Sequence, residues 1–279
     1  MASRAGRRRG PATYVFRFVV VAYLVLLVAW PVSLIAKQTF ADGFDTLSTA
    51  FQDEEVTSSL LLTARVATAS VLINLVFGVG ISLLLTRYRF PGRRLLSALI
   101  DVPLSVSPVV VGLSLTLVYG GREGWFGPGL EDAGFQIIFA TPGIIMATTF
   151  VALPLVIREV VPVLEEIGTD AEQAARSLGA NAIQTFRRIT LPAIKWAVVY
   201  GVVLCLARSL GEFGAVKVVA GNVGGKTRTA TLAVEHKYQQ FGADNLASAY
   251  AIAFLLAAAA VVCITVVSLL RPDASDRRK

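Results

Sequence analysis

The chain has 279 residues, of which 55% are hydrophobic and only 16% are charged. Soluble domains carry about a quarter charged residues, so this composition excludes an ordinary soluble domain and predicts a polytopic membrane protein. The formal net charge of +7 comes from basic residues at the ends of apolar runs, which favours membrane topology over nucleic-acid binding. Cys205 and Cys263 lie inside apolar runs, a placement that indicates neither a metal site nor a disulfide framework.

Six apolar runs are long enough to cross the hydrocarbon core of a bilayer, which requires about 20 residues. We therefore predict an all-α membrane protein with six transmembrane helices. A single membrane domain at 17–270 would lie between a basic arm at 1–16 and a basic tail at 271–279. The first run exceeds the apolar core of a signal peptide and no Ala-x-Ala site follows it, so we expect an uncleaved anchor. The runs are 17–37, 60–86, 96–119, 135–157, 194–216 and 246–270.

Charged residues in the loops alternate in sign along the chain. Basic residues concentrate in the N-terminal arm, in the loop 87–94, in the loop 158–195 and in the tail, whereas the loops 38–59 and 120–134 are mainly acidic. Because basic loops stay on the cytoplasmic side, we expect both termini and the polar segment 169–192 in the cytoplasm.

The segment 169–192, called the elbow below, is too polar to enter a bilayer. Thr169 and Glu172 have the spacing of a capping box, which predicts the start of a helix. Gly179 is expected to end that helix, and Asn181 can cap a second one. The apolar residues at helical spacing are Ala174, Ala175 and Leu178 in the first helix and Ile183, Phe186 and Ile189 in the second.

The elbow resembles the cytoplasmic EAA loop of ABC-importer permeases, in which Glu-Ala-Ala is followed by a glycine six residues after the Glu and then by Ile-x-Leu-Pro. Gln173 stands where that family usually has the Glu, and Glu172 lies one position earlier. Pro192 is expected where the next helix begins. The resemblance implies that the elbow docks on an ATP-hydrolysing subunit; the alternative is an ordinary amphipathic loop helix. The implied docking residues are Glu172, Gln173, Ala174, Ala175, Gly179, Ile189, Leu191 and Pro192.

Two of the apolar runs contain polar or broken segments at membrane depth. Pro103 and Pro108 interrupt the first half of the third run, after Asp101. A broken backbone there lines a polar cavity or is buried in protein, and its freed amides could face an anion; a plain proline kink is the alternative. Arg208 and Glu212 share one helical face of the fifth run, either as a structural ion pair or beside a pathway. The candidate pathway residues are Asp101, Ser105, Ser107, Arg208 and Glu212.

The loop 217–245, on the predicted external side, is mainly basic. A basic mouth would raise the local concentration of an anion, although a solvated loop with incidental charges is the alternative. The segment 221–227 looks like a phosphate-binding loop, but its first glycine is one residue late and no buried strand precedes it. We therefore do not expect this chain to be an ATPase. The candidate mouth residues are Lys217, Lys226 and Arg228.

Four segments resemble the W-type permeases of bacterial sulfate/thiosulfate ABC importers, namely residues 86–93, 101–109, 158–163 and 211–218. The resemblance implies a MetI-like permease core in the bacterial inner membrane that forms half of the translocation pathway. It also implies three partners: a homologous T-type permease, two copies of one ATPase, and an external binding protein that delivers sulfate or thiosulfate. ATP and Mg would bind the ATPase, while this chain would bind no cofactor and catalyse no reaction.

Three functions are alternatives to a sulfate/thiosulfate permease. Molybdate permeases share the 211–214 block, so another oxyanion is possible. An ion-coupled secondary transporter would need titratable carboxylates in its spans, for which only Asp101 and Glu212 are available. A membrane anchor without transport would need neither a broken helix nor a charged pair at depth.

Overall fold

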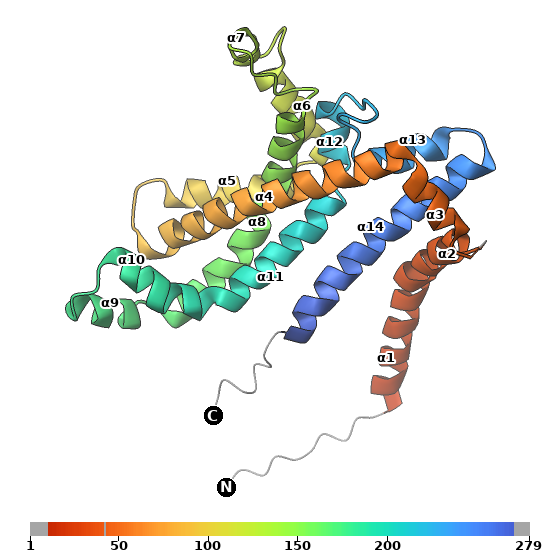
Figure 1. Cartoon of the computed structure of the whole chain (residues 1–279). Helices are drawn as coiled ribbons and strands as arrows, with labels where there is room; N and C mark the ends of the chain where they lie inside the picture. The colour runs from red at the N-terminus through yellow and green to blue at the C-terminus, as the bar shows by residue number, and fades with distance from the viewer. Residues whose placement is uncertain (1–10, 42, 271–279) are drawn as a thin grey trace.

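The computed structural model describes residues 11–41 and 43–270, and every regular element in these residues is a helix (Figure 1). The all-α class predicted from the sequence is confirmed. Most of the predicted basic arm and all of the predicted tail lie outside the described residues. The elements are α1 (Pro11–Leu24), η1 (Val25–Ala29), α2 (Trp30–Thr39), α3 (Asp45–Gln52), α4 (Glu54–Arg87), α5 (Arg93–Ser105), α6 (Pro108–Tyr119), α7 (Gly127–Asp132), α8 (Thr141–Ile167), α9 (Asp170–Ser177), α10 (Ala182–Thr185), η2 (Phe186–Thr190), α11 (Leu191–Leu210), α12 (Gly214–Val219), α13 (Ala230–Gln239) and α14 (Ala243–Leu270).

Five helical stretches of the described chain are long and apolar enough to cross a membrane, and one bent pair of helices brings the number to six. Several of them continue past the apolar runs into polar sequence. α4, for example, begins at Glu54 because the Asp53 side chain accepts a hydrogen bond from the Glu55 N–H and caps the helix. The five stretches are Thr13–Thr39, Glu54–Arg87, Thr141–Ile167, Ala182–Leu210 and Ala243–Leu269.

The bent pair is α5 and α6, whose axes differ in direction by 114°. The third apolar run is therefore two helices rather than one straight span. Val106 and Ser107 are extended between them. Pro108 explains this break, because a proline disfavours helical geometry in the residue before it and supplies no N–H for a continuous helix.

The core of the molecule is a layer in which α8 packs against both α4 and α11. Gly78 of α4 and Gly201 of α11 both face Val156 of α8, so the helix backbones approach closely, as small residues permit in membrane proteins. The buried Asn74 donates to the backbone carbonyl of Thr149 and to Cys205 Sγ. This amide therefore links all three helices.

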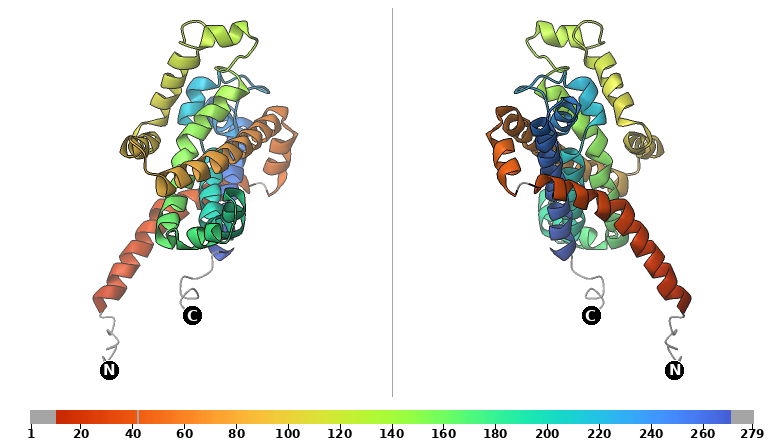
Figure 2. Two further views of the ribbon diagram at one scale, coloured as in Figure 1. Left: turned by 90° about the vertical axis from the view of Figure 1, so that its left-hand side faces the viewer. Right: turned by 90° about the vertical axis from the view of Figure 1, so that its right-hand side faces the viewer.

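The two ends of this layer differ in what covers them. The elbow helices α9 and α10 lie at the end where α4 and α8 finish, and α3 and α13 lie at the opposite end, called the far end below (Figure 1). At the far end α6 packs closely on α12: a Cβ at Gly112 would lie 2.7 Å from the carbonyl oxygen of Ala215. α1 runs away from the body of the molecule (Figure 2), and its side chains from residue 14 to residue 24 are exposed.

Candidate functional site

The elbow consists of two short helices joined by a turn at Gly179. This glycine has a φ of +89°, a conformation that favours glycine, and it follows the end of α9 as predicted. Asn181 caps α10 in a full capping box with Gln184, so its predicted role is confirmed. α11 begins at Leu191 with Pro192 in its first turn, but the π-helical segment η2 joins it to α10 without a break.

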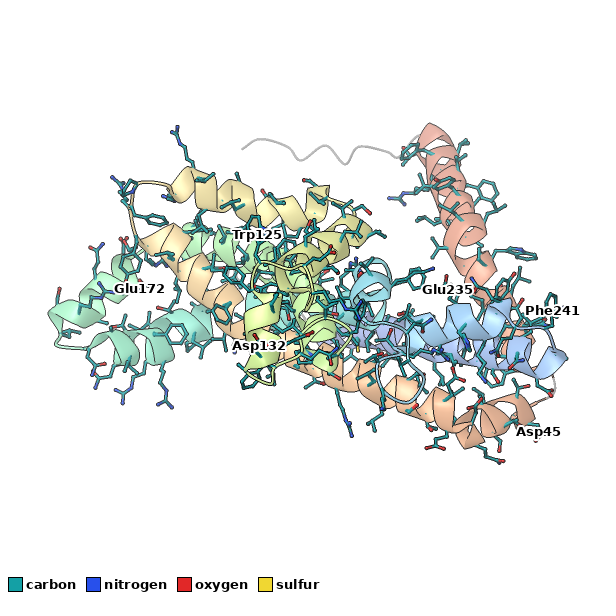
Figure 3. The ribbon with its side chains drawn as sticks, turned by 90° about the horizontal axis from the view of Figure 1, so that it is seen from above. Asp45, Trp125, Asp132, Glu172, Glu235 and Phe241 are labelled. Carbon is teal, nitrogen blue, oxygen red and sulfur yellow. The ribbon has the colours of Figure 1, made fainter. Side chains whose placement is uncertain are left out.

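The predicted capping box at the start of α9 is wrong. The Thr169 hydroxyl makes no capping bond to the helix backbone and instead accepts a hydrogen bond from the Gln173 amide at 2.8 Å. Glu172 points inward, with only 7% of its surface exposed, and lies where α9 meets the end of α4 (Figure 3). Its carboxylate is bound by Arg87, at 3.1 and 3.0 Å from Nε, and by the Thr190 hydroxyl at 2.8 Å.

The other predicted docking residues face outward or lie at the edge of the elbow. Leu178 and Ile183 are 90% and 70% exposed, although both are large apolar side chains. Gln173, Ala174, Gly179, Leu191 and Pro192 are exposed as well, and Ala175 and Ile189 are half-buried. The elbow thus has a polar inner side that is bonded to the spans and an outer side with exposed apolar groups.

The break between α5 and α6 and the arginine of the fifth run meet in one hollow of about 270 Å³. Arg208 reaches this hollow from α11, and Pro103, Val106 and Pro108 line it from the broken span. The Arg208 guanidinium lies 2.7 Å from the carboxylate of Glu212. Arg208 is 37% exposed whereas Glu212 is 2% exposed, so the cation faces the hollow and the carboxylate is enclosed.

Glu212 also holds the start of α12. Its second carboxylate oxygen accepts a hydrogen bond from the Ala215 N–H at 3.0 Å, and its backbone carbonyl accepts one from the Thr231 hydroxyl at 2.8 Å. Glu212 is therefore both the counter-ion of Arg208 and a structural link between α11, α12 and α13.

The remaining predicted pathway residues do not line the hollow. Asp101 is paired with Arg158 of α8 at 3.0 Å, and both side chains are at least half exposed. The Ser105 hydroxyl donates to the carbonyl of Asp101 at 3.3 Å, and the exposed Ser107 makes no capping bond at the start of α6. The structure therefore unites Arg208 with Glu212 and with the break itself, but not with these three side chains.

Two of the three residues proposed for a basic mouth are neutralised by acids. Lys217 pairs with Glu235, and Arg228 pairs with Glu55 at the far end of α4. Lys226 is exposed. The loop therefore presents much less free positive charge than its sequence suggested.

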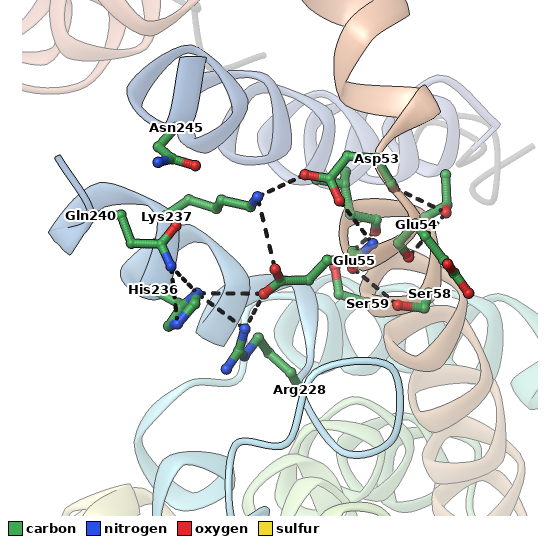
Figure 4. A network of polar contacts seen from close by, with 12 residues as sticks. Asp53, Glu54, Glu55, Ser58, Ser59, Arg228, His236, Lys237, Gln240 and Asn245 are labelled. Atoms are coloured by element: carbon green, nitrogen blue, oxygen red, sulfur yellow. Dashed lines mark hydrogen bonds and ion pairs between the residues drawn. The ribbon is translucent and has the colours of Figure 1, made fainter. Parts of the chain in front are cut away.

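The pairing of Arg228 belongs to a larger ionic cluster that fastens α13 to the start of α4 (Figure 4). Lys237 lies 2.7 Å from Asp53 and 3.8 Å from Glu55, and the imidazole of His236 lies 3.4 Å from Glu55. Burial alone would raise the pKa of Asp53, but the hydrogen bonds from Lys237 and from backbone N–H groups, together with the charge of Lys237, lower it below its ordinary value.

The family model of the "binding-protein-dependent transport system inner membrane component" matches residues 75–278, which is most of the chain. The chain belongs to this family. As an inner membrane component, it is a multi-pass membrane protein of the ABC-importer permease type. The elbow and the broken span of this chain both lie inside the matched region.

Relatives of known name cover nearly the whole chain. The sulfate transport system permease protein CysW of Synechococcus elongatus is 46% identical over 89% of this chain and 85% of its own length. The CysW protein of Escherichia coli K12 is 41% identical over 93% of this chain and 87% of its own length. The sulfate transport system permease protein CysT of Salmonella typhimurium is 34% identical over 89% of this chain and 88% of its own length.

A solved structure supports the permease fold. The chain matches a bacterial ABC transporter involved in the import of the acidic polysaccharide alginate with a TM-score of 0.75, covering 93% of this chain and 94% of that one. The two sequences are 17% identical, so this likeness speaks to the fold alone and confirms the predicted MetI-like permease core.

Arg87 is a residue of the site that could not be recognised from the sequence. It counted only as one of several basic loop residues, because its partner Glu172 lies 85 positions later in the chain. The described residues contain no group of three or more His, Cys, Asp or Glu side chains that could hold a metal ion.

Proposed function

We propose that this chain is the permease subunit of an ATP-driven sulfate importer, in which it forms half of the translocation pathway. The observation that carries the proposal is the elbow: two short polar helices that expose Leu178 and Ile183 and are bonded on their inner side to the end of α4. An exposed apolar surface of this kind fits an interaction site, and ATP hydrolysis on a separate subunit requires one. The close relatives named as sulfate permeases favour sulfate as the cargo.

A sulfate importer of this type would have three partners. A homologous T-type permease would supply the other half of the pathway, and an external binding protein would deliver the anion. Two copies of one ATPase would dock at the elbows and would themselves bind ATP and Mg. The basic loops favour an orientation with both termini and the elbow in the cytoplasm. The far end, with α7, α12 and α13, then faces the binding protein.

The pathway is assigned to the hollow at the break between α5 and α6. Arg208 contributes the positive potential that a dianion requires in a medium of low dielectric constant. Glu212 holds this arginine in place and offsets its charge, so the anion would meet an attraction weak enough to allow release. ATP binding would bring the ATPases together, the elbows would carry that motion into the spans, and the cavity would turn from one side of the membrane to the other.

The alternative function, an ion-coupled secondary transporter, is less well supported. Its candidate proton carriers, Asp101 and Glu212, are each already engaged in an ion pair with an arginine. Thiosulfate and molybdate remain alternative cargoes, because tetrahedral oxyanions present similar charge and acceptor geometry.

The proposal is tested by purifying the tagged chain from its native membrane and reconstituting the recovered complex in liposomes. We expect recovery of an ATPase, a second permease and a binding protein, and uptake of radiolabelled sulfate that requires ATP. Competition with thiosulfate, selenate and molybdate then ranks the anions. Uptake driven by a proton gradient without ATP, or recovery of the chain without any ATPase, would overturn the proposal.

A further inference from the structure

The inner side of the elbow is a bonded network rather than a docking surface. Glu172 carries a full carboxylate on a helix that is otherwise exposed, yet its side chain is only 9% accessible. Arg87 Nε donates to both of its oxygens, and the Thr190 hydroxyl donates to one of them. Both oxygens of this carboxylate are thus engaged from within the chain.

Arg87 uses the rest of its guanidinium to hold a second element. One terminal nitrogen donates to the carbonyl of Leu164 at 3.0 Å, and the other donates to the carbonyl of Gly168 at 2.9 Å. These carbonyls lie at the C-terminus of α8, where the last carbonyls of a helix lack intrahelical partners and the helix dipole favours a cation. The flat, forked guanidinium can satisfy all these acceptors at once, which an ammonium cannot.

The network therefore joins four elements at one point. Arg87 is the last residue of α4, Leu164 and Gly168 stand at the end of α8, Glu172 lies in α9, and Thr190 is the residue before α11. α4, α8 and α11 are the three helices of the core layer. α9 is thus attached to the ends of α4 and α8 through Arg87, and to the start of α11 through the bond from Thr190.

We propose that Arg87 is a positioning residue for energy coupling, and that its pair with Glu172 is the joint through which a displacement of α9 reaches α4, α8 and α11. This inference rests on the proposed function and assigns different tasks to the two sides of the elbow. Glu172 transmits motion inside the chain, and the exposed Leu178 on the outer side contacts the ATPase. Loss of the joint should therefore leave the assembly intact while separating ATP hydrolysis from transport.

The test compares variants of the full complex reconstituted in liposomes with its binding protein. Arg87→Ala, Glu172→Ala and the double variant break the joint, and Leu178→Glu alters only the outer side. Arg89→Ala is the matched control, because Arg89 is an exposed arginine of the same loop. For each variant, three quantities are measured: ATPase recovered per permease, rate of ATP hydrolysis, and sulfate transported per ATP.

We expect the two joint variants to retain the ATPase and to lower the sulfate transported per ATP by at least about fivefold, the lower end of coupling factors between linked sites in proteins. The double variant should lose less than the two single losses combined, because the Arg87–Glu172 pair is removed by each of them but can be lost only once. Leu178→Glu should instead lose the ATPase from the purified complex, and the Arg89 control should match the wild type.

Several results would overturn the inference. A normal sulfate-to-ATP ratio in Arg87→Ala would exclude the joint, as would additive losses in the double variant or loss of the ATPase from Glu172→Ala. If the alanine variants are not recovered from the membrane, the sulfate transported per ATP is measured for Arg87→Lys and Glu172→Gln instead, since each of these side chains can still form part of the network. An unchanged ratio in both variants would count against the proposal. Absence of ATP-dependent uptake in the wild-type complex would instead refute the proposed function itself.

Discussion

The packing of α4 on α8 makes a quantitative prediction at Gly78. A methyl group placed there would lie 2.8 Å from Val156 Cγ1 and 2.9 Å from Val156 Cβ, whereas carbon atoms in contact are about 3.5–4.0 Å apart. The second contact cannot be relieved by rotating the valine, because the Cβ position is fixed by the backbone. Gly78→Ala must therefore push the two helices apart by about 1 Å, and overpacking of this kind costs about 1–3 kcal/mol.

Gly80 of the same helix is the control, since a Cβ there would meet no atom within 4 Å. Both substitutions gain the same helix propensity, about 1 kcal/mol for Gly to Ala, so the difference between the two variants isolates the overpacking. In a detergent thermal-unfolding assay, Gly78→Ala should unfold about 2–12 °C below Gly80→Ala, at roughly 2–4 °C per kcal/mol for a chain of this size. Equal midpoints for the two variants would refute the close approach of α4 and α8 at this level.

Three further predictions concern the elbow, the hollow and the far end. Gly179→Val should reduce ATP-dependent uptake, since the left-handed backbone of the elbow turn costs a branched residue about 1–2 kcal/mol; Gly179→Asn, which tolerates this conformation, should transport sulfate nearly normally in the same vesicle assay. Arg208→Gln should lower both the thermal midpoint and uptake, because the buried Glu212 loses its cation. Adding Glu212→Gln to Arg208→Gln should restore the thermal midpoint but not the uptake. If uptake recovered as well, Arg208 would have a structural role only. The lowered pKa of Asp53 means that its bond to Lys237 stabilises the fold above its ordinary pKa of 3.8 and is lost as the pH falls through the lower folded-state value. The midpoint should therefore drop in this acidic range, and Asp53→Asn should make that drop smaller.

The helices themselves could be predicted from the sequence because apolar runs of sufficient length have few alternatives in a bilayer. Their ends could not, since a helix need not stop where the hydrocarbon stops. α8 continues to Ile167, ten residues beyond the end of the predicted run at residue 157, through a stretch that contains four charged residues and Pro162. The break before α6 was foreseeable, because Pro108 acts on its own neighbours, but the angle of 114° depends on packing that a single sequence does not contain.

In the candidate site, too, the roles that depend on near neighbours in the sequence could be predicted, and those that depend on distant partners could not. Asn181 and Gly179 act within a few residues, and their predicted roles hold. Glu172 was assigned to a local capping box, but it binds Arg87 of another helix instead, since the guanidinium offers a charge-assisted bond that the neutral backbone N–H of Thr169 cannot match. The predicted basic mouth has a related gap: summing the charges of one loop ignores Glu55, which lies at the start of α4 and pairs with Arg228.

Polar contacts along α4 explain why one helix organises so much of this chain. Apolar helices in lipid gain little from burying more apolar surface, so close packing and hydrogen bonds decide how they are arranged. α4 has such contacts at its start, where Glu55 binds Arg228, at its middle, where Asn74 binds two other helices, and at its last residue, where Arg87 binds the elbow. A helix fixed at three levels moves as part of the core layer rather than past it. These contacts connect the elbow at one end of α4 with the ionic cluster at its other end, which is the physical continuity that the proposed coupling requires.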